Sequence, residues 1–82
     1  MMSWHVYLLR CADGTLYAGA TNDVAKRVAA HAVGTGAKYT RGRGPIVLVW
    51  KRRVKDRSAA LKLEARFKRM TRKGKLALVR AD

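Results

Sequence analysis

The sequence predicts a small α+β domain in which a three-stranded antiparallel sheet is flanked by helices, in the order β-β-α-β-α-α. Three observations predict this class. The first 20 residues contain two strand-like segments around a turn, a helical pattern follows, and the second half holds a short apolar run before two more helical segments. The chain has 82 residues, 49% of them hydrophobic, so we expect a single domain over residues 1–82 with one modest core.

The first two strands are predicted over residues 3–10 and 15–20, which are apolar and rich in strand-forming side chains. The segment Ala12-Asp13-Gly14 between them is typical of a hairpin turn. These three segments therefore predict an antiparallel pair at the start of the chain.

The length of this turn decides where two tyrosines point. A two-residue loop places Tyr7 and Tyr17 on opposite faces of the sheet, and a three-residue loop places them on one face, because side chains alternate along a strand. We favour the three-residue loop, in which Gly14 takes the left-handed conformation that such loops need. Gly19 then lies opposite Tyr7 and leaves space for its ring.

Helix signals bracket the remaining segments. A first helix is predicted over residues 23–33, with capping side chains in Thr21-Asn22-Asp23 and an end at Gly34. A glycine-rich basic loop follows over residues 34–44. The apolar run at 46–50 predicts the third strand.

Two helices are predicted after the third strand. Either Asp56 or Ser58 can cap the second, over about residues 58–70, and Thr71 can cap a short third helix that reaches Val79. On the second helix, apolar residues recur at Ala60, Leu63, Phe67 and Met70, and this spacing predicts a buried stripe.

Charge indicates the class of partner. Lysine and arginine number 19 against five acidic residues, and residues 38–82 carry +13 of the net +14. A field of this strength attracts polyanions, so we expect contact with nucleic acid and no association with a membrane. Cys11 is the only cysteine, and the first residues show no signal-peptide pattern, which together favour a cytoplasmic protein.

Three polar residues are candidates for chemistry. Arg27 and His31 are four residues apart and share one helix face, although a surface arginine beside a half-buried histidine would show the same spacing. Glu64, the only glutamate, borders the apolar stripe of the second helix. It can form a salt bridge with a neighbouring cation, or it can supply the oxygen ligand that Mg²⁺ prefers.

Together these residues resemble the GIY-YIG nuclease superfamily, and the resemblance extends from Trp4 to about Met70. It rests on His5-Val6-Tyr7, on Tyr17-Ala18-Gly19 ten residues later, and on the arginine, histidine and glutamate that follow. The compact form of the chain is similar to the small uncharacterised bacterial members.

The resemblance implies a role for each residue. One of Tyr7 and Tyr17 orients or deprotonates the attacking water, and Arg27 binds the scissile phosphate. His31 assists proton transfer, and Glu64 holds a single Mg²⁺ or Mn²⁺. No small-molecule cofactor is implied. The implied activity is endonuclease cleavage of DNA phosphodiester bonds, in repair or recombination, with DNA favoured over RNA and the oligomeric state left open.

The chain departs from the family pattern at three places. His5 and Ala18 replace a glycine and an isoleucine of the family motifs, and strand positions tolerate both changes. The third departure keeps a second interpretation open: the chain has no asparagine after Glu64, where many active members carry one. The alternative is a weakly active or inactive module that binds nucleic acid with the same fold.

Basic residues outside this set are predicted to follow the nucleic-acid backbone, with a tyrosine stacking on a base. These residues are Lys38, Tyr39, Arg41, Arg43, Lys51, Arg52 and Arg53. A solvated loop would explain the composition around the first four of them equally well.

Overall fold

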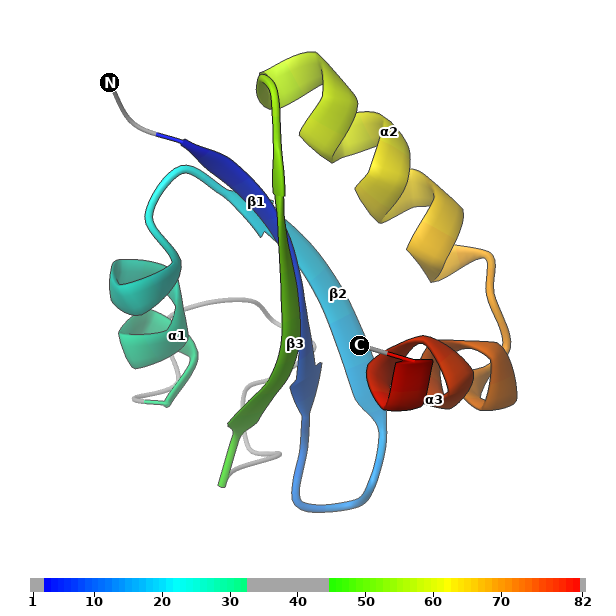
Figure 1. Cartoon of the computed structure of the whole chain (residues 1–82). Helices are drawn as coiled ribbons and strands as arrows, with labels where there is room; N and C mark the ends of the chain where they lie inside the picture. The colour runs from blue at the N-terminus through cyan, green and yellow to red at the C-terminus, as the bar shows by residue number, and fades with distance from the viewer. Residues whose placement is uncertain (1–2, 33–44, 82) are drawn as a thin grey trace.

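The computed structural model describes residues 3–32 and 45–81. Within them, three strands and three helices follow the predicted order β-β-α-β-α-α, and the α+β class is confirmed (Figure 1). The elements are β1 (Trp4–Arg10), β2 (Leu16–Thr21), α1 (Val24–Ala32), β3 (Val47–Val54), α2 (Arg57–Lys68) and α3 (Arg72–Ala81). The sheet is antiparallel with the strand order β2-β1-β3.

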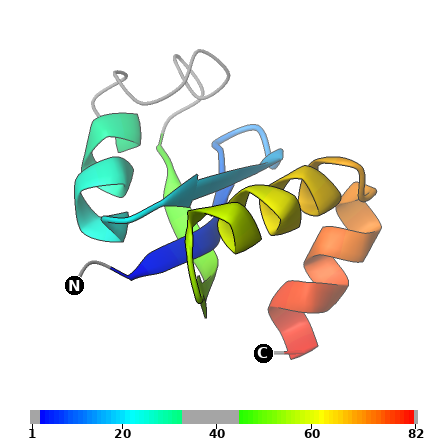
Figure 2. The same cartoon turned by 90° about the horizontal axis from the view of Figure 1, so that it is seen from above.

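The helices cover opposite faces of the sheet, with α1 on one side and α2 and α3 on the other (Figure 2). The central strand β1 is therefore buried on both faces, which explains its continuous apolar run. Its four residues from Val6 to Leu9 are each at most 1% exposed. Val6 and Leu8 belong to the core beneath α2, and Tyr7 and Leu9 point to the face that carries α1.

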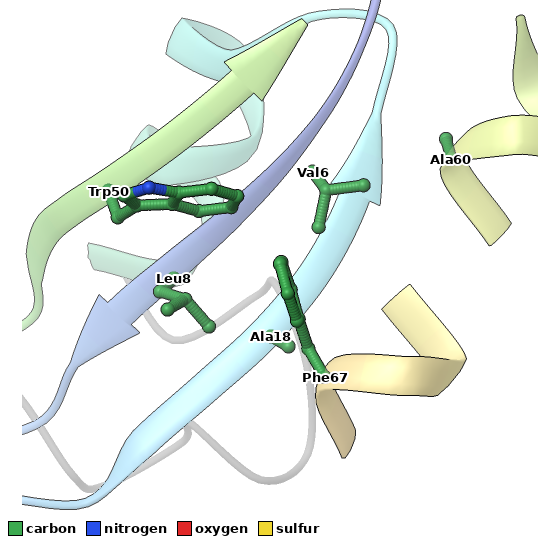
Figure 3. Packing of buried hydrophobic residues seen from close by; sticks show 6 residues of the cluster. All are labelled: Val6, Leu8, Ala18, Trp50, Ala60 and Phe67. Atoms are coloured by element: carbon green, nitrogen blue, oxygen red, sulfur yellow. The ribbon is translucent and has the colours of Figure 1, made fainter. Parts of the chain in front are cut away.

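The main core lies between the sheet and α2 (Figure 3). Trp50 of β3 meets Phe67 of α2 edge to face, with ring centroids 5.0 Å apart, an arrangement that aromatic pairs prefer. The apolar stripe predicted on the second helix is confirmed, since Ala60 and Phe67 are buried and Leu63 and Met70 pack against the same core. The cluster consists of Val6, Leu8, Ala18, Trp50, Ala60 and Phe67.

The predicted three-residue hairpin is confirmed. The Cys11 N–H donates to the Thr15 carbonyl at 2.9 Å, and Gly14 has a φ of +84°, in the left-handed region that glycine enters without steric cost. Tyr7 pairs with Gly19 in the register, as expected. Tyr7 and Tyr17 thus share the face of the sheet that carries α1.

Each helix begins at a predicted capping residue. The Asp23 carboxylate accepts from the Lys26 N–H at 3.1 Å, and the Asp56 carboxylate accepts from the Ala59 N–H at 2.8 Å. For α3, the Thr71 hydroxyl accepts from the N–H of the third residue after it, at 3.1 Å. Asp56, and not Ser58, therefore caps α2.

The predicted ends of the third strand, the second helix and the third helix differ from the structure, and α3 continues past Val79 to Ala81. The third strand does not end at Trp50: β3 continues to Val54, because its basic residues pair with β1 through the backbone although their side chains lack an apolar pattern. The ladder also has an irregularity between Leu8 and Leu9, which leaves Val49 as an extra residue on β3. The second helix ends at Lys68, before Met70. The predicted helix end at Gly34 and the loop at 34–44 lie outside the described residues.

Candidate active site

The hairpin places Tyr7 at the centre of the candidate site. Its side chain is 1% exposed and lies across Gly19 on the neighbouring strand. A Cβ atom added at Gly19 would overlap the Cζ and hydroxyl oxygen of Tyr7. The prediction that Gly19 leaves space for the Tyr7 ring is therefore confirmed, because only a residue without a side chain leaves that room.

His31 reaches the same place from α1. Its imidazole is 1% exposed, and its Nε2 lies 3.1 Å from the Tyr7 hydroxyl oxygen. The His31 ring also lies 5.4 Å from the Tyr17 ring, measured between centroids. A buried imidazole needs a hydrogen-bond partner, and the Tyr7 hydroxyl provides one. His31 thus touches both tyrosines of the predicted set.

Arg27 lies one helical turn before His31 and acts on the same phenol. Burial raises the pKa of Tyr7, while a hydrogen bond from Arg27 and its positive charge lower it again. Burial also lowers the pKa of His31, and the charge of Arg27 adds to that effect. At neutral pH the site therefore holds a protonated phenol against a neutral imidazole, beside a fixed cation.

The lowered pKa of His31 predicts a pH-dependent stability. The unfolded chain binds a proton on this histidine near pH 6.5, where the folded chain does not, so the stabilisation is complete above about 6.5 and is lost as the pH falls through the folded-state pKa. Urea midpoints measured from about pH 8 to 5 should fall at the acid end. The fall should be smaller in His31→Gln. His5→Gln keeps the buried imidazole and should show the same pH dependence as the wild type. If both variants reduce the fall of the urea midpoint equally, the pH dependence does not come from His31.

Tyr17 and Glu64 complete the set from β2 and α2. Lys68 joins them: its Nζ lies 3.6 Å from Glu64 Oε2 and 5.8 Å from the Tyr17 ring centroid. The Glu64 side chain is 20% exposed, so the carboxylate is partly shielded yet open to solvent. Its charge also reaches Tyr7, where it contributes to the raised pKa of the phenol. The salt bridge predicted as one alternative for Glu64 is present.

Two hollows border this cluster. One, of about 250 Å³, lies at the start of α1 and is lined by Arg27 together with Lys26. The other, of about 310 Å³, lies at β2 and is lined by Tyr17, Lys68 and Lys75. The two hollows share no lining residue, and each is lined by a residue of this cluster. The structure thus clusters four of the residues predicted for catalysis, Tyr7, Tyr17, Arg27 and His31, and Glu64 approaches this cluster through Lys68.

The predicted backbone-binding residues of β3 are split between the two faces of the sheet. Lys51 pairs with Tyr7 in the register, so Lys51 and Arg53 share the face of the candidate site. Arg52 points to the other face, where its guanidinium lies 5.3 Å from the Trp50 ring centroid. The other four predicted residues, Lys38, Tyr39, Arg41 and Arg43, lie outside the described residues.

Sequence reasoning counted Lys68 only among the neighbouring cations of Glu64, and it did not single out Lys75. Lys68 had a signal, since it follows Glu64 by four residues on one helix, the spacing of a helical ion pair. Lys75 had none: it lies on a different helix from Glu64 and Lys68, and only the packing of α3 beside β2 brings it to the hollow.

A known protein family, curated relatives and solved structures resemble this chain over most of its length. The family described as the GIY-YIG catalytic domain matches residues 3–77. A UPF0213 protein of Vibrio cholerae is 54% identical over 77 residues, which cover 93% of this chain and 76% of the relative. The solution NMR structure of a UPF0213 protein from Bacillus halodurans is 43% identical, covers 99% of this chain and 86% of its own, and has a TM-score of 0.64. The solution NMR structure of an E. faecalis protein is 38% identical, with the same coverage and a TM-score of 0.67.

Among the described helices, none has the length and apolar character that a membrane span requires.

Proposed function

Because the chain belongs to the GIY-YIG catalytic-domain family, whose superfamily comprises endonucleases, we propose that it is a metal-dependent endonuclease that hydrolyses DNA phosphodiester bonds. The observation that carries the proposal is the 3.1 Å contact between the Tyr7 hydroxyl and His31 Nε2, with Arg27 acting on the same phenol. The Tyr7 phenol as proton donor, the His31 imidazole as neutral base and the Arg27 guanidinium as fixed cation suit an attack by water on a phosphate.

Tyr7 and His31 together take up the proton that the attacking water loses. The phenol keeps its proton at neutral pH, so it can act as a base only if it passes that proton on. In the tautomer with hydrogen on Nδ1, His31 Nε2 accepts it. The attacking water then gives a proton to the Tyr7 oxygen as the phenol proton moves to His31. The water oxygen bonds to phosphorus as the bond to the leaving sugar oxygen breaks, the sugar oxygen takes a proton from the solvent, and His31 then releases its proton to the solvent.

Arg27 and Tyr17 bind the phosphate in this proposal. The Arg27 guanidinium is a fixed cation with several donors, and it would neutralise the charge that builds up on the phosphate oxygens. Tyr17 is half-buried and lines an open hollow, in contrast to the fully buried Tyr7. We therefore assign Tyr17 to orienting the phosphate. Tyr7 is assigned to the proton transfer because its hydroxyl contacts His31 Nε2 at 3.1 Å.

GIY-YIG nucleases generally depend on a divalent metal, and Glu64 is the residue here that fits one. Among the described residues, no three histidine, cysteine or acidic side chains lie close enough together to hold a metal ion. One carboxylate suffices for Mg²⁺, which commonly takes its other ligands from water and substrate phosphates. Bound at Glu64, Mg²⁺ or Mn²⁺ would lower the pKa of a coordinated water and offset phosphate charge.

The basic surface sets the path of the DNA. Lys51 and Arg53 extend the candidate site across β3, and Lys38, Tyr39, Arg41 and Arg43 remain predicted contacts. Such contacts recognise the phosphate backbone and carry no base sequence. We propose that the chain acts as one domain in the bacterial cytoplasm on branched or damaged DNA, in repair or recombination.

A second candidate function is DNA binding without cleavage. The ion pair between Glu64 and Lys68 supports it, because an ammonium group beside the only glutamate competes with a metal for that carboxylate. The absence of an asparagine after Glu64 supports it as well.

The two functions are separated by incubating the protein with plasmid, branched, nicked and single-stranded DNA, with Mg²⁺ or Mn²⁺ and with EDTA. The endonuclease proposal expects cleaved products only with metal, and binding of the same substrates in EDTA. Binding without cleavage of any substrate would overturn it in favour of the second candidate. An RNA duplex of the same sequence tests the preference for DNA.

A further inference from the structure

Two lysines from different helices line one hollow beside the proposed active site. Lys68 ends α2 and Lys75 lies in the first half of α3, and both line the hollow of about 310 Å³ with Tyr17. Two ammonium groups repel each other, so their convergence is unfavourable without a nearby anion. Glu64 supplies one negative charge to Lys68, at 3.6 Å.

The position of Lys75 is fixed by the fold and does not depend on Glu64. Arg72, the first residue of α3, donates from its Nε to the Gly14 carbonyl in the β1–β2 turn, at 3.1 Å. Lys75 follows Arg72 by three residues and therefore lies on the same side of the helix. The hydrogen bond thus turns Lys75 toward the beginning of β2, which includes Leu16 and Tyr17.

The charge of Lys75 is not balanced by any acidic side chain in the part of the chain that the structure describes. Burial lowers the pKa of Lys75, and the charge of Lys68 lowers it further. Of the two lysines, only Lys68 has an ion pair within residues 3–32 and 45–81. A partly buried cation beside a second cation favours an anionic ligand over water.

We propose that Lys68 and Lys75 bind a backbone phosphate of the cleaved DNA strand, next to the phosphate that is hydrolysed. The ligand is a phosphate because its several acceptor oxygens can bridge two ammonium groups at once. It is the neighbouring phosphate because Lys68 both pairs with Glu64 and lines this hollow, whereas Arg27, proposed to bind the hydrolysed phosphate, lines the other hollow. The inference rests on the proposed function for the identity of the strand, and its test measures binding alone.

The test compares Lys75→Gln with Lys73→Gln, which removes the same charge from an exposed position of α3. Affinity for a short DNA duplex is measured in EDTA at several salt concentrations. Lys75→Gln should weaken binding about 5-fold or more at low salt and reduce the slope of log affinity against log salt by about 0.9, the value for one lost phosphate contact. Lys73→Gln should leave the slope unchanged, and Lys75→Arg should retain most of the affinity.

Inorganic phosphate, followed by NMR at low salt, provides a second measurement. Titration should shift the signals of Tyr17 and Lys75 in the wild type and lose that effect in Lys75→Gln, whose amide spectrum reports whether it is folded. Equal effects of Lys75→Gln and Lys73→Gln on affinity and slope would overturn the inference. If the wild type binds DNA through Lys75 but cleaves nothing, the nuclease proposal fails and the phosphate subsite stands. If the wild type cleaves DNA and Lys75→Gln binds DNA normally, the nuclease proposal stands and the phosphate subsite fails.

Discussion

Glu64→Gln should reduce DNA cleavage in Mg²⁺ by at least about 100-fold, the scale on which loss of one electrostatic contact in an active site acts. The amide keeps the shape of the side chain and removes the charge that would hold the metal. DNA binding in EDTA should remain unchanged or become tighter, because the lost carboxylate no longer repels phosphate. Measured on the same folded preparation, the cleavage rate should therefore fall while the affinity in EDTA does not.

A purely structural role for Glu64 predicts another result. Its partner Lys68 has a side chain that is 52% exposed, and an exposed ion pair contributes only about 0–1 kcal/mol to stability. Cleavage would then fall only in proportion to the folded fraction. Asp13→Asn serves as the matched control, since it removes one negative charge from the hairpin turn and keeps an oxygen that can accept from Thr15. Undiminished cleavage by Glu64→Gln would remove this residue from the mechanism.

Gly19→Ala should destabilise the folded protein by about 1–3 kcal/mol, the range for overpacking a buried site. The new methyl group would overlap the ring and hydroxyl of Tyr7, which is 1% exposed and has little room to move. Any ring shift that relieves the overlap also disturbs the 3.1 Å contact with His31. Cleavage should therefore fall further than the loss of folded protein explains. Urea unfolding and the cleavage rate per folded molecule measure the two effects.

The same substitution elsewhere provides the control. In Gly74→Ala, the new methyl group would lie 3.2 Å from Met70 Cε, the end of a flexible side chain, and alanine is favoured over glycine in a helix by about 0.5–1 kcal/mol. This variant should be neutral or slightly stabilised. Combining Gly19→Ala with Tyr7→Leu removes the overlapping ring atoms, so the cost of the alanine should largely disappear there. An equal cost with and without Tyr7 would show that the overlap is not its cause.

Local sequence features determined the elements and much of their register. Asp13 and Gly14 fixed the three-residue hairpin, since the aspartate accepts from Thr15 and the glycine adopts φ +84°. Capping side chains set where the helices begin, as Asp56 does for α2. Both act within a few residues, so residue type and spacing along the chain predict them. The face shared by Tyr7 and Tyr17 then followed from alternation along two paired strands.

Backbone pairing and packing decided what local pattern could not. The continuation of β3 to Val54 depends on hydrogen bonds to β1, which its basic side chains do not reveal. The contact of Tyr7 with His31 joins residues 24 positions apart and required α1 to cover that face of the sheet. The approach of Lys75 to Lys68 and Tyr17 required α3 to be tied to the hairpin turn through Arg72. The sequence by itself determined which residues could carry the chemistry, because residue type and helical or strand spacing are local properties. Only the tertiary structure decided which charges meet at the site, because distances between separate elements depend on how the whole core packs.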